Sequence, residues 1–253
     1  MKQPTARLTF LSALTEYRCL TVRQSLAAGL ASEQMTRRYG RELVKNGLVS
    51  VKPFQAMESS GRPENLILPT PKGFKAVGVN AKPLEQRLFL HQYYLNWCRI
   101  KFDDLKQFAV RPTFQVRSIG GFWPDGTLVL RSEKLDKSLL FFLEVDMGTE
   151  SISGELAAKR GAYRELFSSR TYKEIGQYFN GFRVLFVFSD KSRLRAFLRL
   201  KRDLYSFIWS TDFQSLNRSG AGAAIWQRGA ETSEQFSILG SLQSVTTDSE
   251  QTT

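Results

Sequence analysis

The spacing of apolar and polar residues changes from helical to strand-like within the first 80 residues. Apolar positions recur every three or four residues in three segments, which predicts short helices over residues 5–21, 21–29 and 33–46. Ser32 is a typical N-cap for the third helix, and Gly47 is a typical stop. Two short apolar runs, at residues 48–51 and 65–68, then predict two strands, and Thr70-Pro-Lys-Gly73 begins a short closing helix.

Three helices followed by two strands are the order of elements in a winged helix, so we assign residues 1–80 to a winged-helix DNA-binding domain. The third predicted helix has two faces, of which Met35, Tyr39 and Leu43 form the apolar one. Another face is polar and mostly basic, and we expect it to contact DNA; its residues are Gln34, Arg37, Arg38, Arg41 and Lys45. The alternatives are a solvated basic face without a ligand and a surface that contacts a protein.

The pattern over residues 81–230 predicts a second, α/β domain with a central mixed sheet. Its predicted helices cover residues 84–102, 153–167 and 191–209, and its predicted strands cover 108–116, 127–130, 139–143, 182–188 and 223–227. The run 182–188 is densely apolar, as expected for a central strand. Residues 231–253 are rich in Ser, Thr, Gln and Glu, which predicts a disordered tail.

Acidic residues gather where two of these strands meet. Asp125 precedes the strand 127–130, and the run 139–143 ends in Glu144-Val-Asp146. The polar break between the runs has the length of a hairpin turn, and residues two apart on a strand share a face, so a hairpin would bring the three carboxylates together. Like charges so close repel each other unless a cation lies between them, and carboxylate oxygens suit Mg²⁺ or Mn²⁺.

The helix predicted after Gly148 adds three candidates. Lys159 is its first strong base and could stabilise charge that develops on a phosphate. Tyr163 follows one turn later and is either a nucleophile or a packed core residue. Glu150 is either an acid that supports the cluster or a favourable charge near the start of the helix. Taken singly, each acidic residue also has a structural explanation, because acids at strand ends are usually solvated.

A Pro-Asp pair, an apolar strand ending in Glu-x-Asp and a lysine on the next helix resemble the core of PD-(D/E)xK nucleases. The sequence departs from that pattern at Asp146, which stands where the lysine is expected, and Lys159 would replace it from the helix. A sharper resemblance, over residues 5–190, is to the replication-relaxation family, which includes the C-class plasmid mobilisation relaxases. The residues that carry it are Trp123-Pro-Asp125, Phe142–Glu150, Lys159 and Tyr163. The resemblance implies a winged helix followed by a restriction-endonuclease-like domain.

The charge of the chain favours a polyanionic partner. Its 253 residues carry a net charge of +12, with a sequence pI of about 9.8, which suits nucleic acid or an anionic membrane surface. No apolar run approaches the ~20 residues of a spanning helix and no signal peptide is recognised, so we expect a cytoplasmic protein. Two distant cysteines and one histidine exclude a disulfide framework, a structural zinc site and a relaxase site built on a histidine cluster.

We therefore expect a DNA-binding, divalent-metal-dependent endonuclease or relaxase that hydrolyses or nicks a phosphodiester in double-stranded DNA. Asp125, Glu144 and Asp146 would hold Mg²⁺ or Mn²⁺, and Lys159 would neutralise the phosphate in the transition state. A plasmid origin of transfer or replication as the substrate, and relaxosome or replication proteins as partners, are implied by the resemblance alone.

Two alternatives to this function remain open at the level of the sequence. One is a catalytically inactive DNA-binding accessory or regulatory protein of plasmid mobilisation or replication, which would keep the fold without its chemistry. The other is a protein-interaction adaptor whose basic surface meets an acidic partner. The sequence also leaves open a two-fold symmetric homodimer, which is common among winged-helix proteins.

Overall fold

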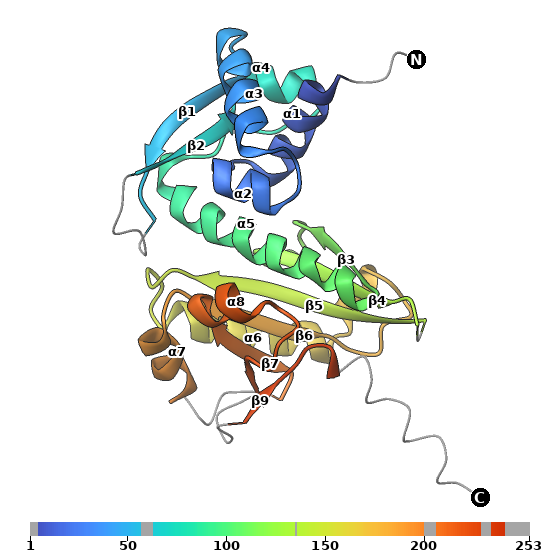
Figure 1. Ribbon diagram of the computed structural model, residues 1–253. Coiled ribbons are helices and arrows are strands. Elements are labelled where there is room, and N and C mark those ends of the chain that lie inside the picture. Colours follow the sequence, from blue (N-terminus) through green and yellow to red (C-terminus); the bar gives the residue numbers. More distant parts are fainter. Residues whose placement is uncertain (1–4, 57–62, 135, 200–205, 229–233, 241–253) are drawn as a thin grey trace, which may run out of the picture. The chain divides into compact units, whose positions relative to one another are not determined.

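The computed structural model describes residues 5–56, 63–134, 136–199, 206–228 and 234–240. The chain divides into two compact units, Met1–Ile100 and Lys101–Thr253, whose helices and strands are labelled in Figure 1. The division falls within helix α5 (Phe89–Asp103), whereas the sequence analysis places the domain boundary near residue 80. Each unit is described by itself below.

Buried hydrogen bonds explain why most of α5 belongs to the first unit. The side-chain amide of Gln24 donates to the carbonyl oxygen of Tyr93 at 2.7 Å, and that of Asn96 donates to the carbonyl oxygen of Cys19 at 2.5 Å. Both amide side chains are buried, where an unsatisfied donor would be costly. The apolar pattern predicts a helix here but not the bonds of its polar side chains, so it could not locate this division.

The first unit has the order of elements that the sequence predicts. Before α5 its described elements are α1 (Ala6–Tyr17), α2 (Val22–Ala27), α3 (Glu33–Lys45), β1 (Val49–Phe54), β2 (Glu64–Pro69), α4 (Pro71–Ala76) and the short helix η1 (Gln86–Leu88). Strands β1 and β2 pair antiparallel, and the side chains of Thr21, Ser32 and Thr70 cap the three helices that follow them. The elements themselves are thus confirmed, while the winged-helix interpretation of their arrangement stays a prediction.

Gly73 in α4 packs against the backbone of Leu48, where a side chain has no room. A Cβ atom at residue 73 would lie 2.0 Å from the Leu48 carbonyl oxygen, and a backbone atom cannot move aside as the end of a side chain can. We expect Gly73→Ala to lower the free energy of unfolding by about 2 kcal/mol, measured by urea denaturation.

The matched control for this substitution is Gly161→Ala in α6 (Glu155–Ser168). Nothing lies within 4 Å of a Cβ added there, so we expect the free energy of unfolding to stay unchanged or to rise by up to about 1 kcal/mol. Equal losses of stability at the two glycines would contradict the close packing of α4 against Leu48.

The described residues of the second unit form a mixed, seven-stranded sheet in the order β3-β4-β5-β6-β7-β8-β9. Its strands are β3 (Val110–Gln115), β4 (Gly126–Ser132), β5 (Lys137–Asp146), β6 (Arg183–Phe188), β7 (Ile208–Asp212), β8 (Trp226–Arg228) and β9 (Gln235–Phe236). Strands β4 and β5 form the predicted antiparallel hairpin, and β5, β6 and β7 run parallel. The predicted α/β fold with a central mixed sheet is confirmed, and β6 occupies the central position.

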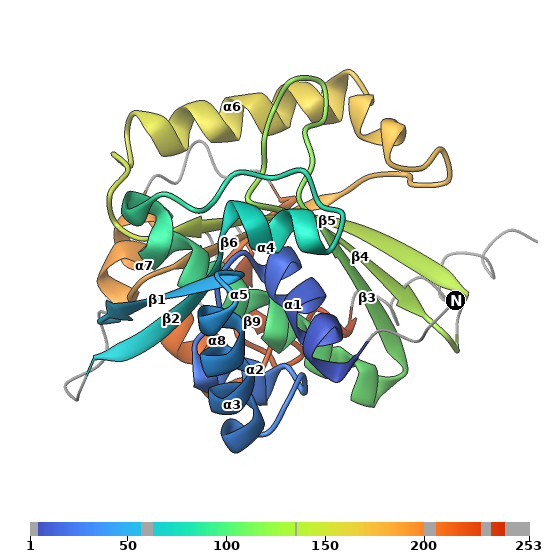
Figure 2. The same ribbon diagram turned by 90° about the horizontal axis from the view of Figure 1, so that it is seen from above.

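Helix α6 runs along one face of this sheet, as Figure 2 shows from above. Its buried Tyr163 belongs to one apolar cluster with Phe142 of β5 and Phe186 of β6. Residues at even positions of β5 therefore point towards α6, which determines where the acidic end of this strand projects. Among its described residues, the other helical segments of the unit are η2 (Asp104–Phe108), η3 (Thr171–Glu174), α7 (Lys191–Leu198) and α8 (Phe213–Ser219). Within the described residues, no helix has both the length and the hydropathy needed to cross a membrane.

Three predictions for the C-terminal part are wrong. The helix predicted over 191–209 ends at Leu198 as α7, and Ile208 instead begins β7. Every residue of β7 is buried, which is typical of an inner strand rather than of one face of a helix. The predicted last strand is β8, but β9 pairs with it and forms the edge. Strand β9 and the buried Ile238 also lie within the predicted disordered tail, of which residues 231–233 and 241–253 are outside the described part.

Candidate carboxylate and lysine site

Asp125 and Glu144 lie opposite each other at one end of the β4–β5 hairpin. Gly126 pairs with Leu143 in the antiparallel ladder, so the residue before Gly126 faces the residue after Leu143. Oδ2 of Asp125 accepts a hydrogen bond from the Val145 N–H at 2.8 Å. The hairpin therefore brings together two of the three carboxylates that the sequence analysis selects.

Glu144 is buried beneath α6, and both of its oxygens have a contact there. Its side chain is 1% exposed. The Tyr163 hydroxyl donates to Oε1 at 2.5 Å, and Nζ of Lys159 lies 2.9 Å from Oε2. Lys159 and Tyr163 are four residues apart on α6, so they lie one turn apart on the same face.

Lys159 connects Glu144 to a second carboxylate. Its Nζ donates to Oε1 of Glu150 at 2.8 Å. The side chains of Lys159 and Glu150 are 23% and 30% exposed, so solvent reaches the cluster through them and not through Glu144. Glu144, Lys159 and Glu150 thus form one contact network, to which Tyr163 is attached from the core. Asp125 lies opposite Glu144 in the hairpin and acts on this network through its charge.

Burial and charge determine the protonation of this network. Burial and the neighbouring Asp125 raise the pKa of Glu144 from 4.5 to about 7, although Lys159 and Tyr163 act to lower it. Burial acts to lower the pKa of Lys159, but Glu144 and Asp125 outweigh it, and the net pKa is raised. Burial, followed by the charge of Glu144, raises the pKa of Tyr163 well above its ordinary value. Near neutral pH, Glu144 can therefore exchange a proton while Lys159 remains a cation.

Tyr163 is placed as a supporting residue rather than as an accessible nucleophile. Its side chain is fully buried, and its ring packs edge-on against Phe122 with 4.8 Å between the centroids. Its hydroxyl is directed at Glu144. Both observations favour the core-packing alternative of the sequence analysis and add a hydrogen bond that holds the Glu144 carboxylate.

Asp146, the third predicted carboxylate, pairs with an arginine. Nε of Arg193, in the first turn of α7, donates to Oδ2 of Asp146 at 2.6 Å, and the same guanidinium also donates to the carbonyl oxygen of Glu150. Oδ1 of Asp146 accepts from the Gly148 N–H at 3.0 Å. Arg193 is not among the residues that the sequence predicts for this site. A signal for it existed, because α7 follows β6 and the carboxyl ends of adjacent parallel strands meet at one edge.

The arrangement of acids bears on the predicted Mg²⁺ or Mn²⁺. Among the described residues, no group of three or more His, Cys, Asp and Glu side chains is placed to hold a metal ion. Mg²⁺ in enzymes of phosphate chemistry is commonly held by only one or two carboxylates, with water and substrate phosphates completing its shell. Asp125 and Glu144 have the donor chemistry for such a site, while the contacts of Asp146 favour a structural role.

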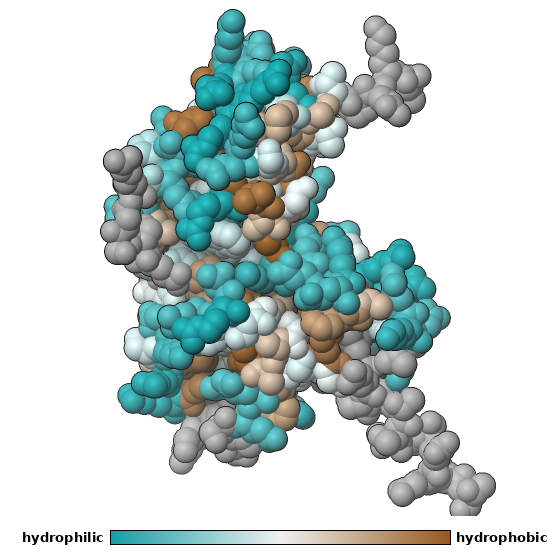
Figure 3. Space-filling view, viewed as in Figure 1, coloured by the Kyte–Doolittle hydropathy of each residue, from teal (hydrophilic) through white to brown (hydrophobic). Residues whose placement is uncertain are grey.

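The five residues predicted to contact DNA lie on the exposed part of α3. Gln34, Arg37, Arg38, Arg41 and Lys45 are all exposed, and the surface over α3 is largely hydrophilic in Figure 3. Arg37 forms an ion pair with Glu33, one turn earlier on the helix, at 2.5 Å. Arg38 forms one with Glu42, one turn later, at 3.0 Å. Within the described residues, Arg41 and Lys45 make no ion pair, so their charges are the ones most available to a ligand.

The comparisons with known proteins concern the segment that holds the carboxylates. No curated protein and no solved structure matches the chain significantly. The family model described as replication-relaxation matches residues 96–180, which is about a third of the chain and excludes α3 and Arg193. This segment runs from α5 to the loop before β6 and contains all of the residues predicted for the carboxylate and lysine site. The match supports the replication-relaxation resemblance for this part of the chain.

Proposed function

We propose that this protein binds double-stranded DNA and cuts a phosphodiester bond at a plasmid origin of transfer or replication, with Mg²⁺ or Mn²⁺ as the cofactor. The observation that carries the proposal is the network of Glu144, Lys159 and Glu150 at the end of the β4–β5 hairpin, with Asp125 opposite Glu144. The replication-relaxation match supports the role in plasmid replication or mobilisation, because it covers these residues.

The chemistry of the site suits phosphodiester hydrolysis. A divalent cation held by Asp125 and Glu144 would activate water and stabilise the leaving oxygen. The cation of Lys159 would stabilise negative charge on the phosphate in the transition state, and Tyr163 would keep Glu144 oriented through its 2.5 Å hydrogen bond. Trp123, two residues before Asp125, is 65% exposed and offers a ring against which a base of the substrate can stack.

Within this proposal the first unit is a winged helix that locates the DNA through the exposed basic face of α3. Arg41 and Lys45 would contact phosphates, and Gln34, Arg37 and Arg38 would contribute further polar contacts. Arg37 and Arg38 would have to exchange carboxylate partners for DNA, a change that costs little because both ion pairs are solvent-exposed.

The salt dependence of DNA binding tests the role of α3. We expect Arg41→Ala/Lys45→Ala to weaken binding to a duplex and to lower the slope of log K against log salt by about 2, since each phosphate contact contributes about 0.9. Fluorescence anisotropy over a range of salt concentrations measures this. Lys75→Ala, which removes an exposed cation from α4, is expected to keep the slope. An unchanged slope in the double variant would identify the basic face of α3 as a solvated surface.

A nicking assay tests the proposed cleavage. Purified protein is incubated with a supercoiled plasmid that carries its origin, in Mg²⁺, in Mn²⁺ and in EDTA. We expect open circles in either metal and none in EDTA, and we expect Asp125→Asn to lower the rate by about 100-fold. Asparagine keeps an oxygen that can accept from Val145, so this variant removes the charge and preserves the hairpin contact.

The control for the assay is Glu165→Gln, which neutralises an exposed acid elsewhere on α6 and is expected to nick as fast as the wild-type protein. DNA binding is measured in parallel for every variant, so that loss of cleavage is separated from loss of binding. Open circles that form equally fast with Asp125→Asn would contradict the assignment of this site.

A second candidate function, a DNA-binding accessory or regulatory protein without cleavage, is favoured by a specific observation. Asp146 is engaged with Arg193, and both oxygens of Glu144 are engaged with α6, so the three predicted carboxylates do not act as one set of ligands. The nicking assay distinguishes the two functions: full DNA binding without open circles in either metal would establish the accessory function and exclude the nuclease.

A further inference from the structure

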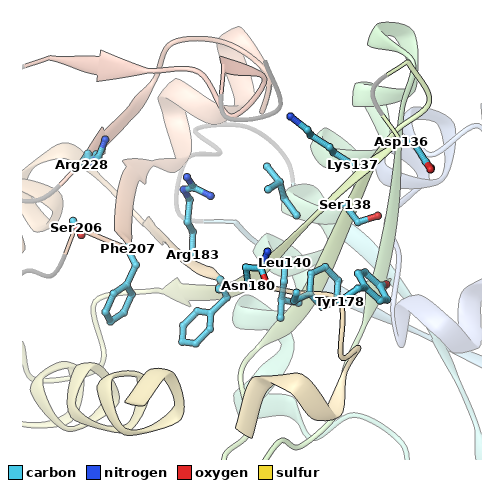
Figure 4. Close-up of a pocket in the computed structure, with 14 residues that line it drawn as sticks. Asp136, Lys137, Ser138, Leu140, Tyr178, Asn180, Arg183, Ser206, Phe207 and Arg228 are labelled. Atoms are coloured by element: carbon cyan, nitrogen blue, oxygen red, sulfur yellow. The ribbon is translucent and has the colours of Figure 1, made fainter. Parts of the chain in front are cut away.

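A pocket of about 650 Å³ lies in the second unit (Figure 4), and none of its lining residues belongs to the carboxylate network. It is formed where β5 and β6 begin, together with the segments that precede β6 and β7 and the last residue of β8. This volume falls within the range of roughly 300–1,000 Å³ that is typical of small-molecule sites. The residues that matter for its chemistry are Lys137, Tyr178, Asn180, Arg183, Phe207 and Arg228.

The pocket and the carboxylate network occupy different parts of the sheet. Lys137 begins β5 and Glu144 lies seven residues later, which corresponds to about 23 Å along a strand. Cross-strand pairing places Phe141 beside Arg183, and Trp209 beside Arg228. Odd positions of β5 and their partners therefore share the face opposite to Glu144. The pocket is thus a separate site with its own side chains.

Positive charge is concentrated in this pocket without acidic partners. Within the described residues, Lys137, Arg183 and Arg228 make no ion pair. The acid in the lining, Asp136, is engaged with Arg131 at 2.9 Å. Burial, followed by the charge of Arg228, lowers the pKa of Arg183. Arg183, whose guanidinium lies 5.0 Å over the Trp209 ring, and Arg228 therefore repel each other, and an anion placed near both would relieve that repulsion.

Aromatic side chains also line the pocket. Tyr178 is 67% exposed and is supported from behind by the buried Phe179, at 4.3 Å between ring centroids. Phe207 is half-buried and stacks in parallel on Phe167, at 5.3 Å. In Figure 4, Arg228 and Tyr178 lie at opposite ends of the pocket, with Arg183 and Asn180 between them. An exposed ring and several cations along one site are the combination that binds the bases and phosphates of single-stranded nucleic acid.

We propose that this pocket binds a short segment of a single DNA strand, with phosphates at Arg183 and Arg228 and a base on Tyr178. An acidic peptide would satisfy the cations but would leave the exposed ring without a flat partner. A duplex would present its phosphates but would keep its bases stacked inside the helix. The inference goes beyond the proposed function, because it holds whether or not the protein cuts DNA, and its failure would leave the nicking assay unaffected.

Oligonucleotide binding tests this proposal. The full chain carrying Arg41→Ala/Lys45→Ala, which removes the contribution expected from α3, is titrated into a labelled oligothymidylate about 12 nucleotides long, a length within the usual site sizes. We expect Tyr178→Ala and Arg228→Ala each to weaken binding about fivefold or more. Arg228→Ala should also lower the salt slope by about 0.7, and Arg228→Lys should retain it. Arg218→Ala, an exposed cation outside the pocket, is expected to change the affinity by less than about twofold.

A free nucleotide and a duplex also carry phosphates and bases, so each is tested as an alternative ligand. The unlabelled single strand, thymidine monophosphate and a duplex of equal length are each added to displace the labelled oligothymidylate. Displacement by the single strand at much lower concentration than by either competitor supports the proposal. Equal displacement by the mononucleotide would assign the pocket to a free nucleotide, and equal displacement by the duplex would assign it to backbone contacts alone. Either result would overturn the single-strand proposal, as would identical affinities of the pocket variants and Arg218→Ala.

Discussion

Relative to Glu144→Gln, the wild-type protein is expected to lose about 3 kcal/mol of its free energy of unfolding as the pH rises from 4.5 to 7. The pKa of Glu144 is 4.5 when the chain is unfolded and about 7 when it is folded. Between these values the folded state binds more protons than the unfolded state, so stability falls with rising pH. Below pH 4.5 both states are protonated and the penalty is absent, and above pH 7 it is complete.

Urea denaturation in EDTA at several pH values across this window measures the effect. Subtracting the values of Glu144→Gln removes the contributions of titrating groups that the two proteins share. Glu165→Gln is the matched control because its carboxylate is exposed on the same helix, and its difference from the wild-type protein should vary by less than about 0.5 kcal/mol. If the difference in the free energy of unfolding between the wild-type protein and Glu144→Gln stays constant between these pH values, Lys159 and Tyr163 fully offset the effect of burial on the pKa of Glu144.

Lys159→Met provides a second test, which removes a group that lowers the pKa of Glu144. Lys159 acts to lower the pKa of Glu144, so its removal should raise that pKa further. The pH range over which the free energy of unfolding falls would then extend to higher pH. The destabilisation by this variant should therefore grow between pH 7 and pH 8, where the wild-type contribution of Glu144 is already complete. If the cost of Lys159→Met is independent of pH in this range, the ion pair does not control the protonation of Glu144.

The sequence predicts the pairing of Asp125 with Glu144 because both depend on one hairpin. Alternating side chains and a short polar break determine which residues face each other across two antiparallel strands, and these are local properties of the chain. Lys159 and Glu150 follow within one helix and one loop, so their approach to Glu144 is also nearly local. This explains why the core of the candidate site could be predicted before its distances were known.

The role of Asp146 could not be predicted in the same way. Its partner Arg193 lies 47 residues further along the chain and reaches it because β6 pairs in parallel with β5. Parallel pairing is a long-range property that apolar spacing does not encode. Strand β7 could not be predicted for a related reason. Its first residues lie within the helix predicted over 191–209, and only pairing with β6 identifies Ile208 and Trp209 as strand residues.

Loss of Arg193 should therefore destabilise the second unit more than loss of any exposed cation near it. We expect Arg193→Met to lower the free energy of unfolding by about 3 kcal/mol at neutral pH, because it leaves a buried carboxylate without its cation. The Asp146 side chain is 1% exposed and that of Arg193 is 17% exposed, so water cannot replace the guanidinium. The bond from the Gly148 N–H remains and keeps the loss at the lower end of the range for buried pairs.

A double-mutant cycle separates this pair from the general effect of substitution. Asp146→Asn/Arg193→Met removes both charges, and we expect it to be more stable than Arg193→Met alone by about 2 kcal/mol. Arg195→Met is the matched control, since Arg195 is an exposed cation on the same helix without an ion pair among the described residues, and it should stay within about 0.5 kcal/mol of the wild-type protein. If the cycle shows no coupling and Asp125→Asn still abolishes nicking, Asp146 would again be a candidate for the third metal ligand. A large coupling energy between Asp146 and Arg193 would instead assign Asp146 a structural role, in which it connects the end of β5 to the first turn of α7. Asp125 and Glu144 would then remain as the carboxylates of the site.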